Sequence, residues 1–255
     1  TLYDTLDIVI VPTPTPGFDF VEACFGSPTA FTNTSTSVDP ITNYNWTFEP
    51  GQTSNVQDPS YTFTAPGIHQ VELIVISANG CEDTLVLDVN AHHIPVAAFG
   101  IPAPCLWPSS QFYDSSSVVN DSIVAWSWDF GDASASSNQQ DPAHVYSASG
   151  PYNVSLLVTS GFGCQNSVTT SINIYEGPDA AFTVNPPSGN VGNDIFFTDA
   201  SVENPQPIIS WTYDFGDGSG ANTADAVHQF DPEGEYAVTL IVIDDAGCPD
   251  TATVV

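Results

Sequence analysis

At 255 residues, with 42% hydrophobic side chains, the chain is long enough to bury the core of one large domain or of two to three small ones. It carries 30 acidic residues and no lysine or arginine, so its formal net charge is −30. Nucleic acid and anionic membrane surfaces are bound through basic side chains, and no run of about 18 apolar residues offers a membrane-spanning helix. The composition therefore excludes nucleic acid as a partner and excludes membrane insertion.

Three similar blocks of sequence follow one another. The segments NYNWTFEPG, AWSWDFGD and SWTYDFGDG begin at positions 43, 125 and 210 and place Phe48, Phe130 and Phe215 at intervals of 82 and 85 residues. Later segments keep the same step, which indicates a tandem repeat of about 80 residues. We expect repeat 1 at residues 17–95, repeat 2 at 96–178 and repeat 3 at 179–255.

Both ends of the chain fall within a repeat. The opening YDTLDIVIVPTPTP matches EDTLVLDVNAHHIP, which closes repeat 1, so residues 1–16 are predicted to be the last strand of a preceding repeat plus a linker. Repeat 3 is predicted to be truncated at its last strand. Because the chain also lacks an initiator methionine and a signal peptide, we expect an interior piece of a longer, processed protein whose neighbouring repeats are joined by short proline-containing spacers.

Within a repeat the apolar residues alternate. Val71, Leu73 and Val75 point to one side and Glu72 to the other, and the segment from Tyr152 shows the same period of two. Alternation, β-branched residues and turns rich in Gly, Asn and Asp predict strands, and no window has a helical stripe. Short strands in units of about 80 residues predict an all-β fold of antiparallel β-sandwiches.

The motifs resemble a known family. WDFGD and YDFGDG, followed by DPAHVY or DAVHQF and then by GPYNVSLLV or EGEYAVTLIV, look like the polycystic kidney disease (PKD) domain. The resemblance implies tandem immunoglobulin-like β-sandwiches that act as extracellular spacer or interaction modules without catalytic residues. A GC pair near the last hairpin, together with an early cysteine, is similar to PKD-type repeats of large Bacteroidota surface proteins exported by type IX secretion as adhesins or filaments.

The five cysteines repeat with the domains. Cys24 and Cys105 stand six residues after the phenylalanine that opens their repeats, where repeat 3 has Ser188, and the late cysteines are Cys81, Cys164 and Cys248. The simplest connectivity pairs Cys24 with Cys81 and Cys105 with Cys164, and leaves Cys248 unpaired or bonded elsewhere. Buried free thiols are the alternative interpretation. No C-x-x-C spacing supports zinc.

The paired aspartates admit three interpretations. Asp129 and Asp132, and likewise Asp214 and Asp217, have the spacing of a turn whose side chains cap backbone amides. An acid/base pair is disfavoured, because the motif recurs in each repeat without a nucleophile or a pocket. Calcium is the sharper alternative, since hard cations take several oxygen ligands. Its candidate ligands are Asp129, Asp132, Asp214 and Asp217, helped by Asp114 or Asp199. Repeat 1 has Thr47 in place of the first aspartate and should bind worse.

The aromatic residues lead to the function that we expect. Two aromatic positions recur in the repeats, one held by Trp46, Trp128 and Tyr213 and the other by Tyr44, Trp126 and Trp211. At least one residue of each pair is predicted to fill the core, with an exposed carbohydrate-stacking face as the alternative. We expect a non-catalytic, disulfide-stiffened segment of an extracellular or cell-surface stalk, filament or adhesin that spaces or presents a binding tip. No cofactor is required in this interpretation. The partners are neighbouring repeats, lateral copies in a multi-chain appendage, and a surface glycan or protein. The alternative function is a polysaccharide- or protein-binding accessory array of a secreted hydrolase.

Overall fold

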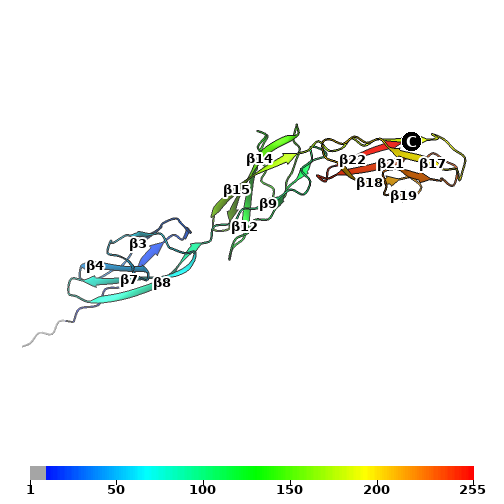
Figure 1. Cartoon of the computed structure of the whole chain (residues 1–255). Helices are drawn as coiled ribbons and strands as arrows, with labels where there is room; N and C mark the ends of the chain where they lie inside the picture. Colours follow the sequence, from blue (N-terminus) through cyan, green and yellow to red (C-terminus); the bar gives the residue numbers. More distant parts are fainter. Residues whose placement is uncertain (1–9) are drawn as a thin grey trace, which may run out of the picture. The chain divides into compact units, whose positions relative to one another are not determined.

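The computed structural model describes residues 10–255, and these residues form strands, turns and irregular segments without any helix. The all-β prediction is confirmed. In the part of the chain that the structure describes there is accordingly no helix of the length and apolarity needed to cross a membrane. The prediction of a strand from a preceding repeat falls mainly on residues 1–9, which lie outside the described residues. Figure 1 shows the strands in chain order.

Repeat 1 consists of two sheets. Its strands are β1 (Phe18–Phe20), β2 (Ala23–Cys24), β3 (Thr29–Asn33), β4 (Ile41–Glu49), β5 (Gln52–Ser54), β6 (Ser60–Tyr61), β7 (Gly67–Ser77) and β8 (Glu82–His92). One sheet has the order β2-β8-β7-β4-β5 and the other the order β1-β3-β6. In Figure 1 the long strands β4, β7 and β8 lie side by side, as their antiparallel registers require. The single parallel pairing of this sheet joins β2 to the end of β8.

Repeats 2 and 3 follow the same plan. The strands of repeat 2 are β9 (Phe99–Gly100), β10 (Ser110–Gln111), β11 (Tyr113–Asp114), β12 (Ile123–Asp129), β13 (Ala143–His144), β14 (Gly150–Ser160) and β15 (Gln165–Ile174). Those of repeat 3 are β16 (Phe182–Asn185), β17 (Ile195–Asp199), β18 (Ile208–Asp214), β19 (Gly220–Ala221), β20 (Ala226–His228), β21 (Val238–Asp244) and β22 (Pro249–Val254). The main sheets are β12-β14-β15 and β19-β18-β21-β22, and the smaller sheets are β9-β11, β10-β13 and β16-β17-β20.

The cores confirm the alternation that the sequence predicted. Val71, Leu73 and Val75 of β7 are fully buried, and the residues between them are only partly covered. At the centre of each core lies the aromatic residue of the repeated motif, Trp46, Trp128 or Tyr213, which is at most 1% exposed. Each of the three donates a hydrogen bond to a backbone carbonyl, from Trp46 Nε1 to Val56 at 3.0 Å, from Trp128 Nε1 to Gln139 at 2.9 Å and from the Tyr213 hydroxyl to Ala224 at 3.1 Å. Large rings with a satisfied polar atom are suited to such burial.

Contacts divide the chain into two compact units whose limits differ from those of the repeats. The first unit contains the chain up to Pro95 together with residues 118–124 and 159–166 of repeat 2. The second contains residues 96–117, 125–158 and 167–255. The expected repeat limits at residues 95 and 178 stay predictions.

Candidate functional site

The hairpin between the last two long strands of each repeat presents a cysteine in a defined turn. In repeat 1 the Ser77 amide donates to the Cys81 carbonyl at 2.9 Å, and the Gly80 amide donates to the Ser77 carbonyl at 2.9 Å. The equivalent bonds run from Ser160 to Cys164 (2.8 Å) and from Gly163 to Ser160 (2.8 Å) in repeat 2, and from Asp244 to Cys248 (3.1 Å) and from Gly247 to Asp244 (3.0 Å) in repeat 3. The glycine has a φ of 80° to 83° in each turn, a conformation that glycine adopts without strain. The three late cysteines are therefore presented alike.

The early cysteine lies at the opposite end of its repeat. Cys24 of β2 pairs in parallel with His92, the last residue of β8, and the next amide, that of Phe25, donates to the His92 carbonyl at 2.8 Å. Repeat 2 has the same arrangement, with Cys105 in a parallel bridge to Tyr175 and the Leu106 amide 2.7 Å from the Tyr175 carbonyl. Each early cysteine is thus fixed where its last strand ends.

Two disulfides join these positions between repeats. Cys24 is bonded to Cys164 with the Cα atoms 5.6 Å apart, and Cys105 is bonded to Cys248 with the Cα atoms 5.4 Å apart. Each bond connects the early cysteine of one repeat to the late cysteine of the next. Cys81, which is partly exposed, carries no disulfide. The prediction of disulfides is confirmed, but the predicted pairs Cys24–Cys81 and Cys105–Cys164 are wrong. Cys248, which the sequence left unpaired or bonded elsewhere, is bonded to Cys105.

Strand length explains why the disulfides form between repeats and not within one repeat. Cys24 lies beside the last residue of β8, whereas Cys81 precedes the first residue of the same strand. A strand rises about 3.3 Å per residue, so the eleven residues from Cys81 to His92 separate the two ends by about 36 Å. A disulfide requires Cα atoms within about 7 Å of each other. A bond within one repeat is therefore impossible, and the same geometry holds for Cys105 and Cys164 across β15.

Polar and aromatic contacts surround the first disulfide inside the first compact unit. The His92 ring stacks on Phe162 with centroids 3.8 Å apart and planes inclined by 16°. Its Nε2 atom lies 2.8 Å from Glu22 Oε2, and its Nδ1 atom lies 3.0 Å from Asn90 Nδ2. A neutral imidazole with its proton on Nε2 satisfies both partners, because it donates to the carboxylate and accepts from the amide.

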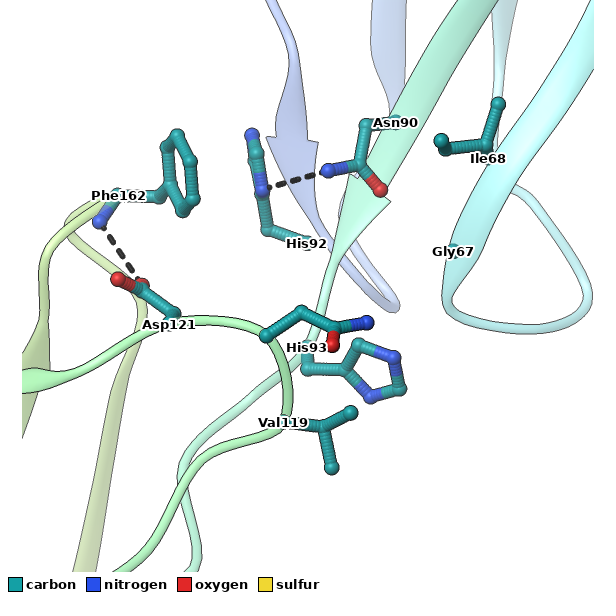
Figure 2. A pocket seen from close by; sticks show the side chains of 9 residues that line it. Gly67, Ile68, Asn90, His92, His93, Val119, Asp121 and Phe162 are labelled. Carbon is teal, nitrogen blue, oxygen red and sulfur yellow. Dashed lines mark hydrogen bonds between the residues drawn. The ribbon is translucent and has the colours of Figure 1, made fainter.

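Figure 2 shows the pocket beside this stack. Asp121 Oδ2 accepts the Phe162 amide at 3.2 Å, and Asn166 Nδ2 donates to the Pro95 carbonyl at 2.8 Å. The pocket is lined by Gly67, Ile68, Asn90, His92, His93, Val119, Asn120, Asp121 and Phe162. None of the lining side chains is a serine, threonine, cysteine or lysine, and the one acidic side chain among them is that of Asp121.

The repeated aspartates form turns. In repeat 2, Asp129 Oδ1 accepts the Gly131 amide at 2.9 Å and Asp132 Oδ1 accepts the Ser134 amide at 3.0 Å. In repeat 3 the same bonds run from Gly216 to Asp214 and from Ser219 to Asp217, both at 2.9 Å. A side-chain oxygen that accepts an amide two residues further along is the bond that aspartate makes in turns. The four aspartate side chains therefore cap backbone amides in turns, as predicted.

Asp114 and Asp199 have different partners. Asp114 Oδ2 accepts the Trp126 indole N–H at 2.8 Å, and Asp199 Oδ2 accepts that of Trp211 at 2.9 Å. Both tryptophans are partly exposed, and each is bonded to an aspartate of its own repeat. Among residues 10–255 no three His, Cys, Asp or Glu side chains are grouped so that they could hold a metal ion. Calcium binding stays a prediction, and melting the protein with calcium and with a chelator would test it.

A histidine pairs with a carboxylate next to each core, a feature that the sequence motifs did not predict. His144 Nε2 lies 2.8 Å from Asp132 Oδ2, and the imidazole stacks on Phe130 with centroids 4.0 Å apart. The Asp132 carboxyl is partly buried, which raises its pKa, but hydrogen bonds from Ser134 and His144 outweigh this effect and lower the pKa below its usual value. The signal available in the sequence was the shared repeat position of His144 and His228.

Repeat 1 reaches a similar arrangement with other residues. His69 Nδ1 lies 3.2 Å from Glu49 Oε1, and its ring stacks on Phe63 with centroids 4.3 Å apart. Glu49 also accepts the Tyr61 hydroxyl at 2.7 Å. Burial and this bond to Glu49 raise the pKa of Tyr61 to about 12. Because Glu49 lies in EPG rather than in GDG and His69 comes from β7, no alignment of the repeats reveals the equivalence.

Comparison with known proteins identifies the class. The model of the PKD domain matches residues 12–91, 92–174 and 176–255. The chain therefore belongs to the PKD domain family and contains three tandem copies.

Relatives in two bacteria share parts of the chain. It is 42% identical over 77 residues to a microbial collagenase of Vibrio alginolyticus, which is 30% of this chain and 9% of the collagenase. It is 28% identical over 162 residues to the pre-pro-metalloprotease PrtV of Vibrio cholerae, which is 63% of this chain and 17% of PrtV. Among solved structures, the PKD1 domain of Vibrio anguillarum Epp is 30% identical, with 32% of this chain and 95% of that domain covered at a TM-score of 0.31. The chain thus spans less than a fifth of each of these two curated relatives.

Proposed function

We propose that the chain is a non-catalytic structural segment of an extracellular stalk, filament or adhesin, in which disulfides join each PKD repeat to the next. The observation that carries the proposal is the connectivity, Cys24 to Cys164 and Cys105 to Cys248. Disulfides persist in oxidising compartments, which favours a location outside the cell. A net charge of −30 keeps such chains soluble and apart unless cations screen them.

The connectivity favours resistance to extension. The shortest covalent path between Cys24 and Cys248 crosses the first disulfide to Cys164, runs back along the chain to Cys105 and crosses the second disulfide. At about 3.6 Å per extended residue this path limits the separation of Cys24 and Cys248 to about 200 Å, against about 800 Å for the reduced chain. Unfolding under load therefore cannot release most of the chain length while both bonds are intact.

Pulling single molecules from residues outside Cys24 and Cys248 tests the proposal. The maximum separation of these cysteines in the oxidised chain should be roughly a quarter of that in the reduced chain, and a reducing agent should restore the full length. The Cys81→Ser variant is the matched control and should behave as the unchanged protein. Equal lengths before and after reduction would refute a mechanical function of the disulfides.

Absence of catalysis is part of the proposal. Its support is that the paired aspartates accept turn amides and that no serine, threonine, cysteine or lysine lines the pocket beside His92. Incubation with peptide, ester and glycoside substrates should show no turnover above that of the buffer. Turnover that follows the protein through purification would contradict this part.

A second function is favoured by the similarity to a collagenase and to PrtV, namely a substrate-binding accessory array of a secreted hydrolase. Trp107, which is 65% exposed, is the side chain best placed for such binding. Sedimentation with insoluble collagen and with insoluble polysaccharides tests it. Binding that Trp107→Ala abolishes and Tyr113→Ala preserves would favour the accessory array, and absence of binding favours the spacer.

The narrower proposal is a Bacteroidota surface protein exported by type IX secretion. It rests on the likeness of the GC turns and early cysteines to such repeats. Antibodies against the three repeats should label intact cells of the source organism. The expected partners of the repeats there are neighbouring repeats of the same chain or laterally packed copies of it. Labelling only after the cells are opened would overturn it.

A further inference from the structure

The two disulfides obey one rule. Cys24 and Cys105 stand six residues after Phe18 and Phe99, and each is bonded to the late cysteine of the following repeat. No other pairing of cysteines occurs in residues 10–255.

Cys81 is a late cysteine in this sense. It occupies the same turn as Cys164 and Cys248, with the same two backbone hydrogen bonds and the same left-handed glycine before it. It differs from them in exposure, since Cys164 is 1% and Cys248 0% exposed, whereas Cys81 is partly open to solvent. The two late cysteines that carry a disulfide are thus buried, whereas Cys81, in the same kind of turn, is partly exposed.

The cysteines of the chain itself cannot supply the partner. Cys24 and Cys105 are already bonded, and strand β8 keeps Cys24 about 36 Å from Cys81. Repeat 3 of a second copy does not supply it either, because Ser188 stands six residues after Phe182, where repeats 1 and 2 have cysteine. The pattern of the two disulfides thus points to the early cysteine of a different repeat as the thiol that fits Cys81.

We infer that Cys81 is the attachment point for a further PKD repeat, located before repeat 1, whose early cysteine forms a third disulfide of the same kind. The inference deepens the proposed spacer function and rests on it. Because repeat 3 has Ser188, it offers no thiol to a repeat that would follow, so the series of inter-repeat disulfides ends at repeat 3.

Bond formation requires an oxidant, for which a small-molecule disulfide suffices. One cysteine thiolate attacks the small disulfide, forms a mixed disulfide and releases the first small thiolate. The second cysteine thiolate attacks the mixed disulfide at the protein sulfur, so the protein disulfide forms and the second small thiolate leaves. The two protons from the cysteines end on the two released thiols.

A tandem variant tests the inference. A second copy of residues 12–95 is placed directly before Pro12 in the full chain, which gives seven cysteines, and the protein is refolded with oxidised and reduced glutathione. The inference expects three disulfides and one free thiol, because Cys24 of the added copy captures Cys81 of the original repeat 1. If that disulfide does not form, three thiols stay free, namely Cys24 and Cys81 of the added copy and Cys81 of the original repeat 1.

A control variant checks the thiol count, and peptide mapping identifies which cysteines are bonded. Replacement of Cys24 by serine in the added copy alone should leave two free thiols under either outcome, which checks the thiol count. Because the chain has no Lys or Arg, peptides are prepared under non-reducing conditions with a protease that cleaves at acidic residues. A Cys24–Cys81 cross-linked peptide in the tandem variant supports the inference. Three free thiols, with the Cys24–Cys164 and Cys105–Cys248 peptides still present, overturn it while leaving the proposed spacer function intact.

Discussion

The imidazole of His228 lies flat against Phe215, with ring centroids 4.2 Å apart and planes inclined by 3°. Its Nε2 atom is 2.6 Å from Asp217 Oδ2. A stacked ring thus connects the turn that follows β18 to the core of repeat 3, and His144 does the same in repeat 2. In a chain without Lys or Arg, the five histidines are the basic side chains available to pair with a carboxylate, and His69 and His92 also do so.

Replacing His144 by alanine should destabilise repeat 2. The variant loses the ring contact with Phe130 and the bond to Asp132, and an aromatic pair contributes about 1 kcal/mol beyond its buried area. For a domain of this size we expect the melting temperature to fall by about 4 to 8 °C, measured by calorimetry. His93→Ala is the control, because among residues 10–255 no carboxylate pairs with His93. An equal fall in both variants would contradict the prediction.

The Asp217 carboxyl should make repeat 3 sensitive to acid. Hydrogen bonds from Ser219 and His228 lower its pKa from 3.8 to about 2 in the folded protein. A carboxyl with a depressed folded pKa stabilises the fold fully above its unfolded pKa, and this contribution is lost as the pH falls from about 4 to about 2.

The Asp217→Asn variant should therefore melt lower than the unchanged protein at pH 7 and approach it near pH 2. Thermal melts between these two values measure the convergence. Asp245→Asn is the control, because it removes one exposed negative charge from the same repeat and so measures how much less repulsion among the carboxylates changes the melting temperature. A constant difference between Asp217→Asn and the unchanged protein at all pH values would show that Asp217 acts by another route.

The inter-repeat disulfides should stabilise the folded chain. Removal of Cys24 and Cys164 together, by serine substitutions, opens a loop with a sequence separation of 140 residues. The chain-entropy treatment gives about 5 kcal/mol for a loop of this length relative to complete unfolding. We expect a lower denaturant midpoint for the double variant and an unchanged midpoint for Cys81→Ser. An equal midpoint for the double variant and the unchanged protein would mean that the bond constrains the unfolded chain little.

Gly216 should tolerate substitution less well than its neighbour Gly218. Both have left-handed backbone angles, with φ of 78° and 91°. A Cβ added at Gly216 would lie 2.7 Å from the Ala237 carbonyl oxygen, whereas a Cβ at Gly218 meets nothing within 4 Å. Gly218→Ala should cost about 1 kcal/mol of unfolding free energy for the backbone alone, and Gly216→Ala should cost more because the backbone of residue 237 must also move. Equal costs from denaturant titrations would show that the clash is relieved without a penalty.

Much of the fold could be predicted from the sequence because the signals are local. The alternation of Val71, Leu73 and Val75 depends only on the strand period, and the burial of Trp46 and Trp128 follows from the same pattern. The turns of Asp129 and Asp214 were likewise predictable, since each side chain bonds an amide two residues further along.

The disulfide partners were not predictable by counting. Repetition makes Cys81 and Cys164 equivalent in sequence, so the spacing alone cannot say which of them meets Cys24. The decision comes from the parallel pairing of β2 with the end of β8, a long-range contact that places Cys24 at one end of the repeat and Cys81 at the other. The His69–Glu49 pair was missed for a related reason, since its residues come from segments that do not align with the GDG turn.

The two disulfides interlock, because the loop from Cys24 to Cys164 overlaps the loop from Cys105 to Cys248. A cut in the backbone before Cys105 is bridged by the first bond, a cut after Cys164 is bridged by the second, and a cut between these residues is bridged by both. Any single break between Cys24 and Cys248 therefore leaves one covalent molecule. For a protein exposed to proteases, this connectivity means that one backbone cut does not release the repeats beyond the cut, because a disulfide still holds them.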